Sequence, residues 1–275
     1  MDTKQLYIDN FDRLKNHRYA GDSFNDIISK PRAFWFGWGR YDKKQSPKSS
    51  VSRLLKRAGN DIVTLVLYNI VKRDLGHYSA GGASTIEEYK EYVDDFATAI
   101  DRECIVIVEP DALPHMLKLE SLDFSQRAEC LIYATESLKQ TPAKVYIDAG
   151  HPNWLSTSEV SKLLMQTETD IADGFSVNVS NFVSTTKCIE WADEVSHLSG
   201  GLHYVIDTSR NGVETDTWLN PDNAKIGNTP TLDTGIEKCD AFLWIKLPGE
   251  SDGKAQGAPK AGKFYAEYAK RLVDE

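Results

Sequence analysis

Residues 104–111, which read CIVIVEPD, decide the kind of fold this chain adopts. Five successive apolar residues, with no alternation of polar and apolar side chains, are typical of a strand buried on both faces of a parallel sheet. Glu109, Pro110 and Asp111 follow at once, so this strand carries two carboxylates at its carboxyl end. Pro110 restricts the backbone between them.

Short apolar runs of the same kind recur along the chain and alternate with amphipathic stretches. The runs predict strands at 33–38, 61–68, 104–108, 144–148, 174–178, 202–206 and 241–245. The amphipathic stretches predict helices at 46–58, 85–100, 125–139, 156–167, 185–198 and 258–273. Thr85 with Glu88, and Ser156 with Glu159, have the spacing of capping boxes at two helix starts.

Repeated strand–helix units indicate an α/β fold with parallel strands and right-handed crossovers. The pattern alone fits either a closed barrel or a doubly wound open sheet. No Pro-rich or Gly-rich linker and no repeat divides the chain. We therefore expect a single domain over residues 1–275, with residues 1–30 as an N-terminal extension that packs on it.

Composition and charge narrow the classes of partner. The chain is 41% hydrophobic and 27% charged, as in an ordinary globular protein, and no apolar run approaches the roughly 18 residues of a membrane span. Its 32 Lys and Arg residues are scattered and the net charge is −9, which argues against nucleic acid as a partner. We expect no membrane partner and a monomer.

Neither the N-terminus nor the cysteines settle the compartment. The first residues lack the basic-then-apolar pattern of a signal peptide, so we expect either a cytoplasmic protein or a secreted one whose signal has been removed. The four cysteines are widely spaced without a CxxC pair, and we expect buried free thiols at Cys104, Cys130, Cys188 and Cys239.

Polar clusters follow one predicted strand after another. In parallel α/β folds the carboxyl ends of the strands meet on one face, which holds the active site. We therefore expect segments that are distant in sequence to form one site. These segments are 68–74 (YNIVKRD), 109–111 (EPD), 148–154 (DAGHPNW), 178–181 (NVSN), 207–212 (DTSRNG) and 246–253 (KLPGESDG).

Asp111 has the features of a general acid. A carboxyl held near apolar walls resists ionisation and can still carry a proton near neutral pH. A second carboxylate, Asp74, would raise the pKa of Asp111 further if the two lie close together. Ser79 could hold a water molecule. The alternatives are an ordinary helix cap at Asp111 and a surface ion pair between Asp74 and Arg73.

Two more clusters suit a hydroxyl-rich ligand. Asp148 and His151 can form hydrogen bonds on either side of Trp154, whose ring can stack on a sugar. The spacing of Asp148 and His151 also resembles half of a metal site, but no matching His or Cys partners stand out elsewhere. We therefore expect no metal and no other cofactor. The loop with Lys246, Glu250 and Asp252 is a generic acidic loop when taken alone, and Trp35 could equally be a core residue.

Taken in order, these motifs resemble glycoside hydrolase family 6, the inverting endoglucanases and cellobiohydrolases. The resemblance is greatest to the bacterial-type endoglucanases. It covers most of the chain, and its longest motifs are IDTSRNG (206–212) and WIKLPGESDG (244–253). The resemblance implies a distorted, TIM-like barrel of seven parallel strands with a cleft or tunnel across the top. It also implies a β-1,4-glucan or cello-oligosaccharide as substrate.

The resemblance also implies roles for individual residues. Asp111 matches the general acid, and Asp74 matches the carboxylate that raises the acid's pKa. Ser79 and Tyr68 match positions that contact the attacking water and the distorted sugar. Asp252 matches the proposed base, with proton relay through water toward Asp74 as the alternative. The predicted substrate-binding residues are Trp35, Asp148, His151, Trp154, Asn178, Trp218, Lys246 and Glu250.

The chain departs from the family pattern at the disulfides. Family members often carry two, but the corresponding positions here hold Leu75, Leu219 and Lys254. The resemblance to the family implies secretion. The missing disulfides are instead compatible with a reducing compartment.

The prediction is an endo-acting, inverting β-1,4-glucanase, because only about thirty residues separate DTSRNG from the next strand and this favours an open cleft. The alternatives are a cellobiohydrolase, a non-catalytic polysaccharide-binding barrel, and a metal-dependent hydrolase built on Asp148 and His151.

Overall fold

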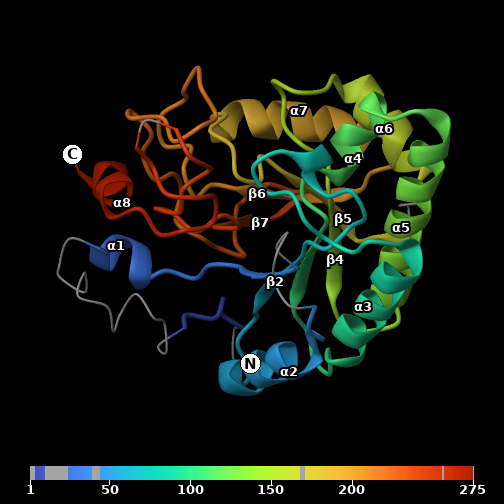
Figure 1. The fold of residues 1–275 in the computed structure, drawn as a ribbon. Coiled ribbons are helices and arrows are strands. Elements are labelled where there is room, and N and C mark those ends of the chain that lie inside the picture. The colour runs from blue at the N-terminus through green and yellow to red at the C-terminus, as the bar shows by residue number, and fades with distance from the viewer. Residues whose placement is uncertain (1–3, 10–23, 39–43, 168–170, 256, 275) are drawn as a thin grey trace.

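Seven parallel strands form one curled sheet in the computed structural model, which describes residues 4–9, 24–38, 44–167, 171–255 and 257–274 (Figure 1). The strands lie side by side in their order along the chain. They are β1 (Phe34–Phe36), β2 (Thr64–Leu67), β3 (Ile105–Val108), β4 (Lys144–Asp148), β5 (Gly174–Val177), β6 (His203–Asp207) and β7 (Cys239–Leu243).

Alternate residues of each strand face two different cores. In β3, Ile105 and Ile107 point into the small core inside the curled sheet, whereas Val106 and Val108 point into the larger core under the helices. All four side chains are buried. A strand with two buried faces has no polar side, which explains why the sequence shows continuous apolar runs.

The two edges of the sheet come close to each other without forming a regular strand pair. The backbone N–H of Ala33 donates to the carbonyl of Trp244 at 2.9 Å, and the Trp35 indole N–H donates to the carbonyl of Ile245 at 2.7 Å. These contacts join the residues before β1 to those after β7. The predicted distorted seven-stranded barrel is therefore confirmed as a curled half-barrel, rather than a flat open sheet with edges far apart.

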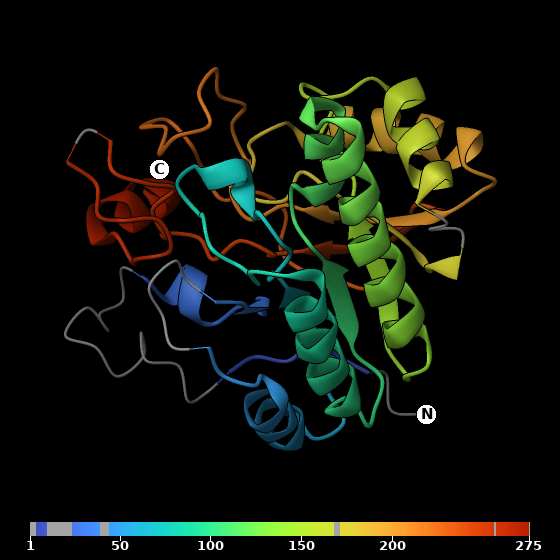
Figure 2. The same ribbon diagram turned by 45° about the vertical axis from the view of Figure 1, so that its right-hand side comes forward.

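The long helices other than α8 cover the outside of the sheet, with α3 beside α5 and α6 beside α7, whereas α8 packs on Phe182 and Ala224 in the loops after β5 and β6 (Figures 1 and 2). Their bounds are α2 (Lys48–Ala58), α3 (Ile86–Thr98), α5 (Ser121–Lys139), α6 (Thr157–Gln166), α7 (Thr185–Leu198) and α8 (Ala266–Val273). The sequence did not predict the short helices and 3₁₀ turns α1 (Asn25–Ile28), η2 (Asp74–Gly76), α4 (Ala112–His115) and η3 (Met116–Lys118).

Local chemistry explains where the predicted bounds hold and where they fail. The capping box of Ser156 and Glu159 is present at the start of α6. At the start of α3, Thr85 accepts the N–H of Glu88, but the Glu88 carboxylate accepts from Ser84 instead of Thr85. The last helix was predicted from residue 258 and begins only at Ala266, since Pro259 and Gly262, with its φ of 74°, interrupt it.

All four cysteines are buried and free, as predicted. Within the described chain, no helix is long and apolar enough to span a bilayer. Part of the predicted N-terminal extension contacts the sheet, because Leu6 forms a parallel bridge with Ile62, and Ile27 and Ile28 are buried. The rest of that extension, residues 1–3 and 10–23, lies outside the described residues.

Candidate active site

The carboxyl ends of the strands carry the backbone strain of the molecule. Eight non-glycine residues in the described chain have positive φ, and all of them lie in loops that follow β2, β3, β5 or β6. Such conformations cost about 1–3 kcal/mol each and occur mostly at functional sites. The eight are Lys72, Asp74, Leu75, Glu109, Asp111, Asn178, Ser180 and Asn220.

Asp111 lies just beyond β3 at a φ of 69°, as the N-cap of α4. Its backbone N–H donates to Oδ2 of Asp148 at 2.7 Å. Burial and the negative charge of Asp74 raise the pKa of Asp111 to about 7, although Lys246 opposes the rise. A carboxyl with that pKa is largely protonated in mildly acidic solution, as a general acid must be.

Asp148, the last residue of β4, holds the backbone of Asp111 in place through a hydrogen bond. It is buried and accepts the Ser176 hydroxyl at 3.1 Å as well as the Asp111 N–H. Burial, and next the charge of Asp111, raise the pKa of Asp148 well above its ordinary value. Two neighbouring buried carboxyls cannot readily both ionise, so the pair favours retention of a proton.

Asp74 lies in a tightly bonded loop that follows β2. The Ser79 N–H donates to Oδ2 of Asp74 at 2.6 Å, and burial raises the pKa of Asp74. Arg73 donates through Nε to the carbonyl of Ser79 at 2.8 Å and through Nη1 to the carbonyl of Tyr68 at 2.6 Å. Its guanidinium lies 4.4 Å from the centre of the Tyr68 ring, which packs edge-on against Trp35 at 5.1 Å. The structure thus brings Tyr68, Asp74 and Ser79 together.

An aromatic pair links this loop to loops on the other side of the mouth. The rings of Tyr78 and Trp218 meet at a steep angle with their centres 5.9 Å apart. A Cβ on Gly253 would lie 2.5 Å from the Tyr78 ring, so Tyr78 packs directly on the backbone next to Asp252. The predicted carboxylates Asp74, Asp111 and Asp252 therefore belong to loops that share one mouth.

Asp252 is held by an ion pair. Both of its carboxylate oxygens accept from Nη1 of the fully buried Arg210, at 2.8 and 2.9 Å, and Oδ2 also accepts the Asn220 N–H at 3.1 Å. These three hydrogen bonds fix the Asp252 carboxylate in the loop that follows β7. The charges that act most strongly on Asp111 come from Asp74 and Lys246.

Trp154, which follows β4, packs near the rings of the half-buried His151 and the buried His115. The His151 ring is 5.7 Å from the Trp154 ring, and the His115 ring is 5.1 Å from it on α4. Burial lowers the pKa of both histidines to about 4, so both are neutral at neutral pH. Sequence reasoning missed His115, although its position four residues after Asp111 could have indicated it.

Of the remaining predicted binding residues, two lie at the mouth and one lies in the interior. Lys246 forms an ion pair with Glu250 at 3.4 Å. Asn178, in contrast, is fully buried, and its side-chain amide donates to the carbonyls of Val183 and Asp207. Its side-chain hydrogen bonds are used within the protein, and its expected contact with substrate stays a prediction. Asp207 fixes the adjacent backbone by accepting the N–H groups of Ser180 and Lys246.

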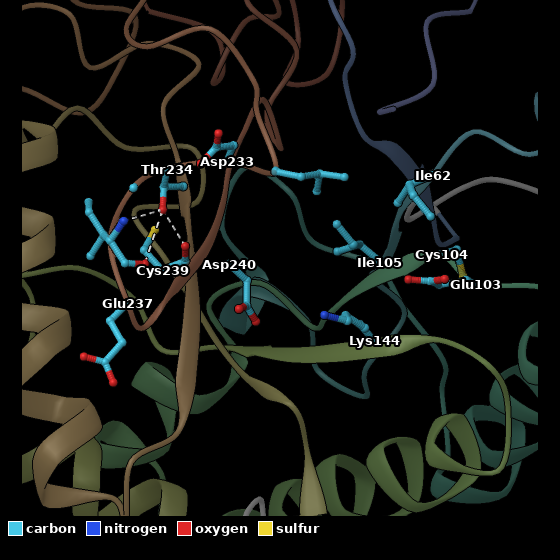
Figure 3. A pocket seen from close by; sticks show the side chains of 13 residues that line it. Ile62, Glu103, Cys104, Ile105, Lys144, Asp233, Thr234, Glu237, Cys239 and Asp240 are labelled. Atoms are coloured by element: carbon cyan, nitrogen blue, oxygen red, sulfur yellow. Dashed lines mark hydrogen bonds between the residues drawn. The ribbon is translucent and has the colours of Figure 1, made fainter. Parts of the chain in front are cut away.

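A cavity of about 580 Å³ lies at the opposite end of the strands (Figure 3). Ile105 and Lys144, the first residues of β3 and β4, line it together with Cys239 and Asp240 at the start of β7. No aromatic ring is among the residues that line it. Within the described ranges, no group of three or more His, Cys, Asp or Glu residues is arranged to hold a metal ion. We therefore place the candidate site at the strained mouth and not in this cavity.

Comparisons with known proteins show what this chain is similar to. The sequence model of the family described as Glycosyl hydrolases family 6 matches residues 7–275. Endoglucanase A of Cellulomonas fimi is 39% identical over 249 residues, which is 90% of this chain and 55% of that protein. Endoglucanase 1 of Streptomyces sp. (strain KSM-9) is 37% identical over 82% of this chain and 65% of that protein. The chain thus spans roughly half to two thirds of these relatives.

The fold is also similar to a solved structure. An endoglucanase of Mycobacterium tuberculosis, in complex with methyl-cellobiosyl-4-deoxy-4-thio-β-D-cellobioside, superposes with a TM-score of 0.92. The two sequences are 34% identical, and the match covers 98% of this chain and 97% of the other.

Proposed function

This chain belongs to glycosyl hydrolase family 6, and on that premise we propose that it hydrolyses internal β-1,4-glucosidic bonds of cellulose or a related β-glucan with inversion at the anomeric carbon. The observation that carries the proposal is the environment of Asp111. Its carboxyl has a pKa of about 7 and lies beside two further carboxyls, at the strand ends where α/β barrels carry out their chemistry.

In the proposed reaction, Asp111 donates its proton to the glycosidic oxygen as the bond from that oxygen to the anomeric carbon breaks. A water molecule attacks the same carbon from the opposite face and loses a proton. The negative charge of Asp74 keeps Asp111 protonated until the reaction begins. Tyr68 and Ser79 line the proposed water and sugar positions.

The identity of the base follows from the two carboxylates available to take the water's proton. Asp252 already accepts three hydrogen bonds, two of them from Arg210. Asp74 accepts the Ser79 N–H through one oxygen, and burial raises its pKa, which favours uptake of a proton by its carboxylate. We therefore favour a relay of the proton through water toward Asp74, with Asp252 and Arg210 fixing the loop after β7.

Substrate binding is proposed along the mouth. Trp35, Trp154 and Trp218 offer ring faces or edges for sugars, and Trp218 is 56% exposed. Lys246 and Glu250 offer hydrogen bonds to hydroxyl groups. We propose that the chain is a single catalytic domain that acts as a monomer without a cofactor, on a secreted route like that expected for the family.

Endo action is supported by the short segment between residues 212 and 241 and by the names of the two bacterial relatives. The rival is exo action, which needs a lasting roof over the site. The contact of Tyr78 with Trp218 is non-covalent and both rings are about half exposed, so it need not prevent a chain from entering sideways.

The test is the product profile on soluble glucan. With carboxymethylcellulose, we expect viscosity to fall well before reducing ends accumulate. With cellohexaose, proton NMR should detect the α-anomer first. Early appearance of the β-anomer would contradict inversion, and cellobiose release at constant viscosity would contradict endo action. A folded sample that binds glucan without cleaving it would support the binding-protein alternative.

A further inference from the structure

Two buried side chains of opposite charge hold the backbone that leads to Asp74. Glu109 accepts the N–H of Asn69 at 2.9 Å and that of Ile70 at 3.1 Å. Arg127, on α5, donates through Nη2 to the carbonyls of Val71 and Lys72, at 3.1 and 3.0 Å. Four consecutive residues, 69–72, are thus held by one carboxylate and one guanidinium.

Burial of both charged side chains costs desolvation free energy. Glu109 is 0% exposed and Arg127 is 4% exposed. Burial raises the pKa of Glu109 to about 7 and lowers the pKa of Arg127, although the nearby charge of Glu109 opposes the second effect. Apolar residues of similar size often stabilise a core as well as, or better than, a buried pair of charges. Stability alone therefore does not account for this pair, whereas precise placement of the backbone does.

The held segment leads directly into the most strained part of the molecule. Lys72, Asp74 and Leu75 have φ values of 53°, 55° and 45°. Non-glycine residues keep such angles only where their surroundings enforce them. Asn69 closes the base of the loop, because its carbonyl accepts the Ala83 N–H at 2.8 Å and its side chain accepts the Trp38 N–H at 2.8 Å.

We propose that Glu109 and Arg127 are positioning residues that hold residues 69–72 so that the Asp74 carboxylate faces Asp111. This inference rests on the proposed function. Neither residue touches the reacting atoms. Glu109 and Arg127 act through the backbone, and Asp74 acts on the acid.

The readout is the titration of Asp111, because a role in stability alone would not change it. The groups that face Asp111 are Asp74 from the loop after β2, Asp148 at the end of β4, Lys246 after β7, and Tyr68 at the end of β2. If Asp74 moves away, Asp111 loses a neighbouring negative charge while Lys246 remains. The pKa of Asp111 then falls, and the alkaline limb of the pH–rate profile moves to lower pH.

The experiment compares Arg127→Met, which keeps the length of the side chain but removes its charge and donors, with Arg127→Lys. For Arg127→Met we expect kcat on soluble glucan to fall on the order of 10- to 100-fold with little change in KM, since a small misplacement suffices for such a loss. The alkaline limb should move to lower pH. Arg127→Lys should recover part of both effects because an ammonium can donate to the same carbonyls.

The matched control is Thr135→Val on the same helix. Thr135 is buried, and its hydroxyl donates to the carbonyl of Leu131, away from the loop. This variant should lose stability without shifting the alkaline limb of the pH–rate profile. If Arg127→Met behaves in the same way, the pair is merely structural and the proposal is overturned. Should Arg127→Met not fold, Glu109→Gln gives the same test with a side chain of the same shape.

A second measurement separates this inference from the proposed function. Carbon-13 NMR titration of the Asp111 carboxyl in wild type and in Arg127→Met needs no activity. A lower pKa in the variant supports the positioning role, and an unchanged pKa overturns it. Failure of the wild-type protein to cleave any glucan would overturn the proposed function alone.

Discussion

The two ends of the sheet differ in how their polar groups are satisfied. At the carboxyl ends, Asp111 and Asp148 lie together, no Lys or Arg among the described residues forms an ion pair with either carboxyl, and Glu109 and Asp111 have positive φ. At the amino ends, Asp240 accepts the Tyr146 hydroxyl at 2.6 Å and lies 2.8 Å from Nδ1 of His203. The described loops at the amino ends contain no non-glycine residue with positive φ.

The cavity of about 580 Å³ lies at the amino ends of the strands, away from Asp111 and Asp148. The presence of a cavity alone therefore does not identify the candidate site. Strain and unbalanced charge are maintained only where the rest of the fold enforces them, and this explains why they mark reactive sites more reliably than empty space does.

The largest expected difference between the two ends is in the rate of hydrolysis. Asp111→Asn should lower kcat by about 10²- to 10⁴-fold, since it removes the proton donor, and asparagine tolerates the positive φ. The matched variant Asp240→Asn should keep kcat within about twofold while costing roughly 1–2 kcal/mol of stability through its weakened hydrogen bonds. Reducing-sugar assays and thermal unfolding measure the two effects.

The same pair of variants contains a check against misfolding. Because the folded protein raises the pKa of Asp111 from 3.8 to about 7, Asp111 lowers stability progressively as the pH rises between these two values, and the full loss is present above pH 7. Asp111→Asn should therefore be at least as stable as wild type at pH 8. If Asp111→Asn and Asp240→Asn lost activity equally, the assignment of catalysis to the carboxyl ends of the strands would be wrong.

The next largest effect concerns pH. Asp111 must be protonated to act, so kcat/KM should be high below about pH 7 and should fall as the pH rises through that value. Asp74→Asn removes the proposed proton acceptor as well as the negative charge that raises this pKa, so kcat should fall and the alkaline limb of the remaining activity should move to lower pH. A profile of kcat/KM from pH 4 to pH 9 for both proteins measures the shift. An unmoved limb would mean that burial alone sets the pKa of Asp111.

The smallest effect concerns the contact between loops across the mouth. In Gly253→Ala the new Cβ would overlap the Tyr78 ring, so Tyr78 should move away and lose its contact with Trp218. Since an aromatic pair contributes about 0.5–1.5 kcal/mol, kcat/KM should fall roughly 2- to 10-fold.

Gly59→Ala is the control for this last effect. Gly59 also has a positive φ, 62°, but it lies before β2 with open space around its Cβ position. It should show a similar loss of stability with unchanged kcat/KM. Identical kinetics for Gly253→Ala and wild type would show that the contact has no part in turnover.

The sequence predicted much of the candidate site because strand periodicity and strand ends are local properties. All seven strands and the six long helices were located, within a few residues at most ends. The end of β3 at Val108 placed Glu109 and Asp111 at the mouth without any knowledge of distant contacts. The errors occurred where the chain lacks periodicity, as at α4, with His115, and at the start of α8.

What the sequence determined by itself is the positions of the strands along the chain, the buried character of both sheet faces and the set of polar side chains that follow each strand. Only the tertiary structure decided how those side chains are paired. In the folded protein, Asp252 forms an ion pair with Arg210, and Asn178 is buried. Arg127 of α5 donates hydrogen bonds to the backbone of residues 71–72. The physical reason is that hydrophobic periodicity depends on neighbours along the chain, whereas a carboxyl's charge state depends on the groups that folding places around it in space.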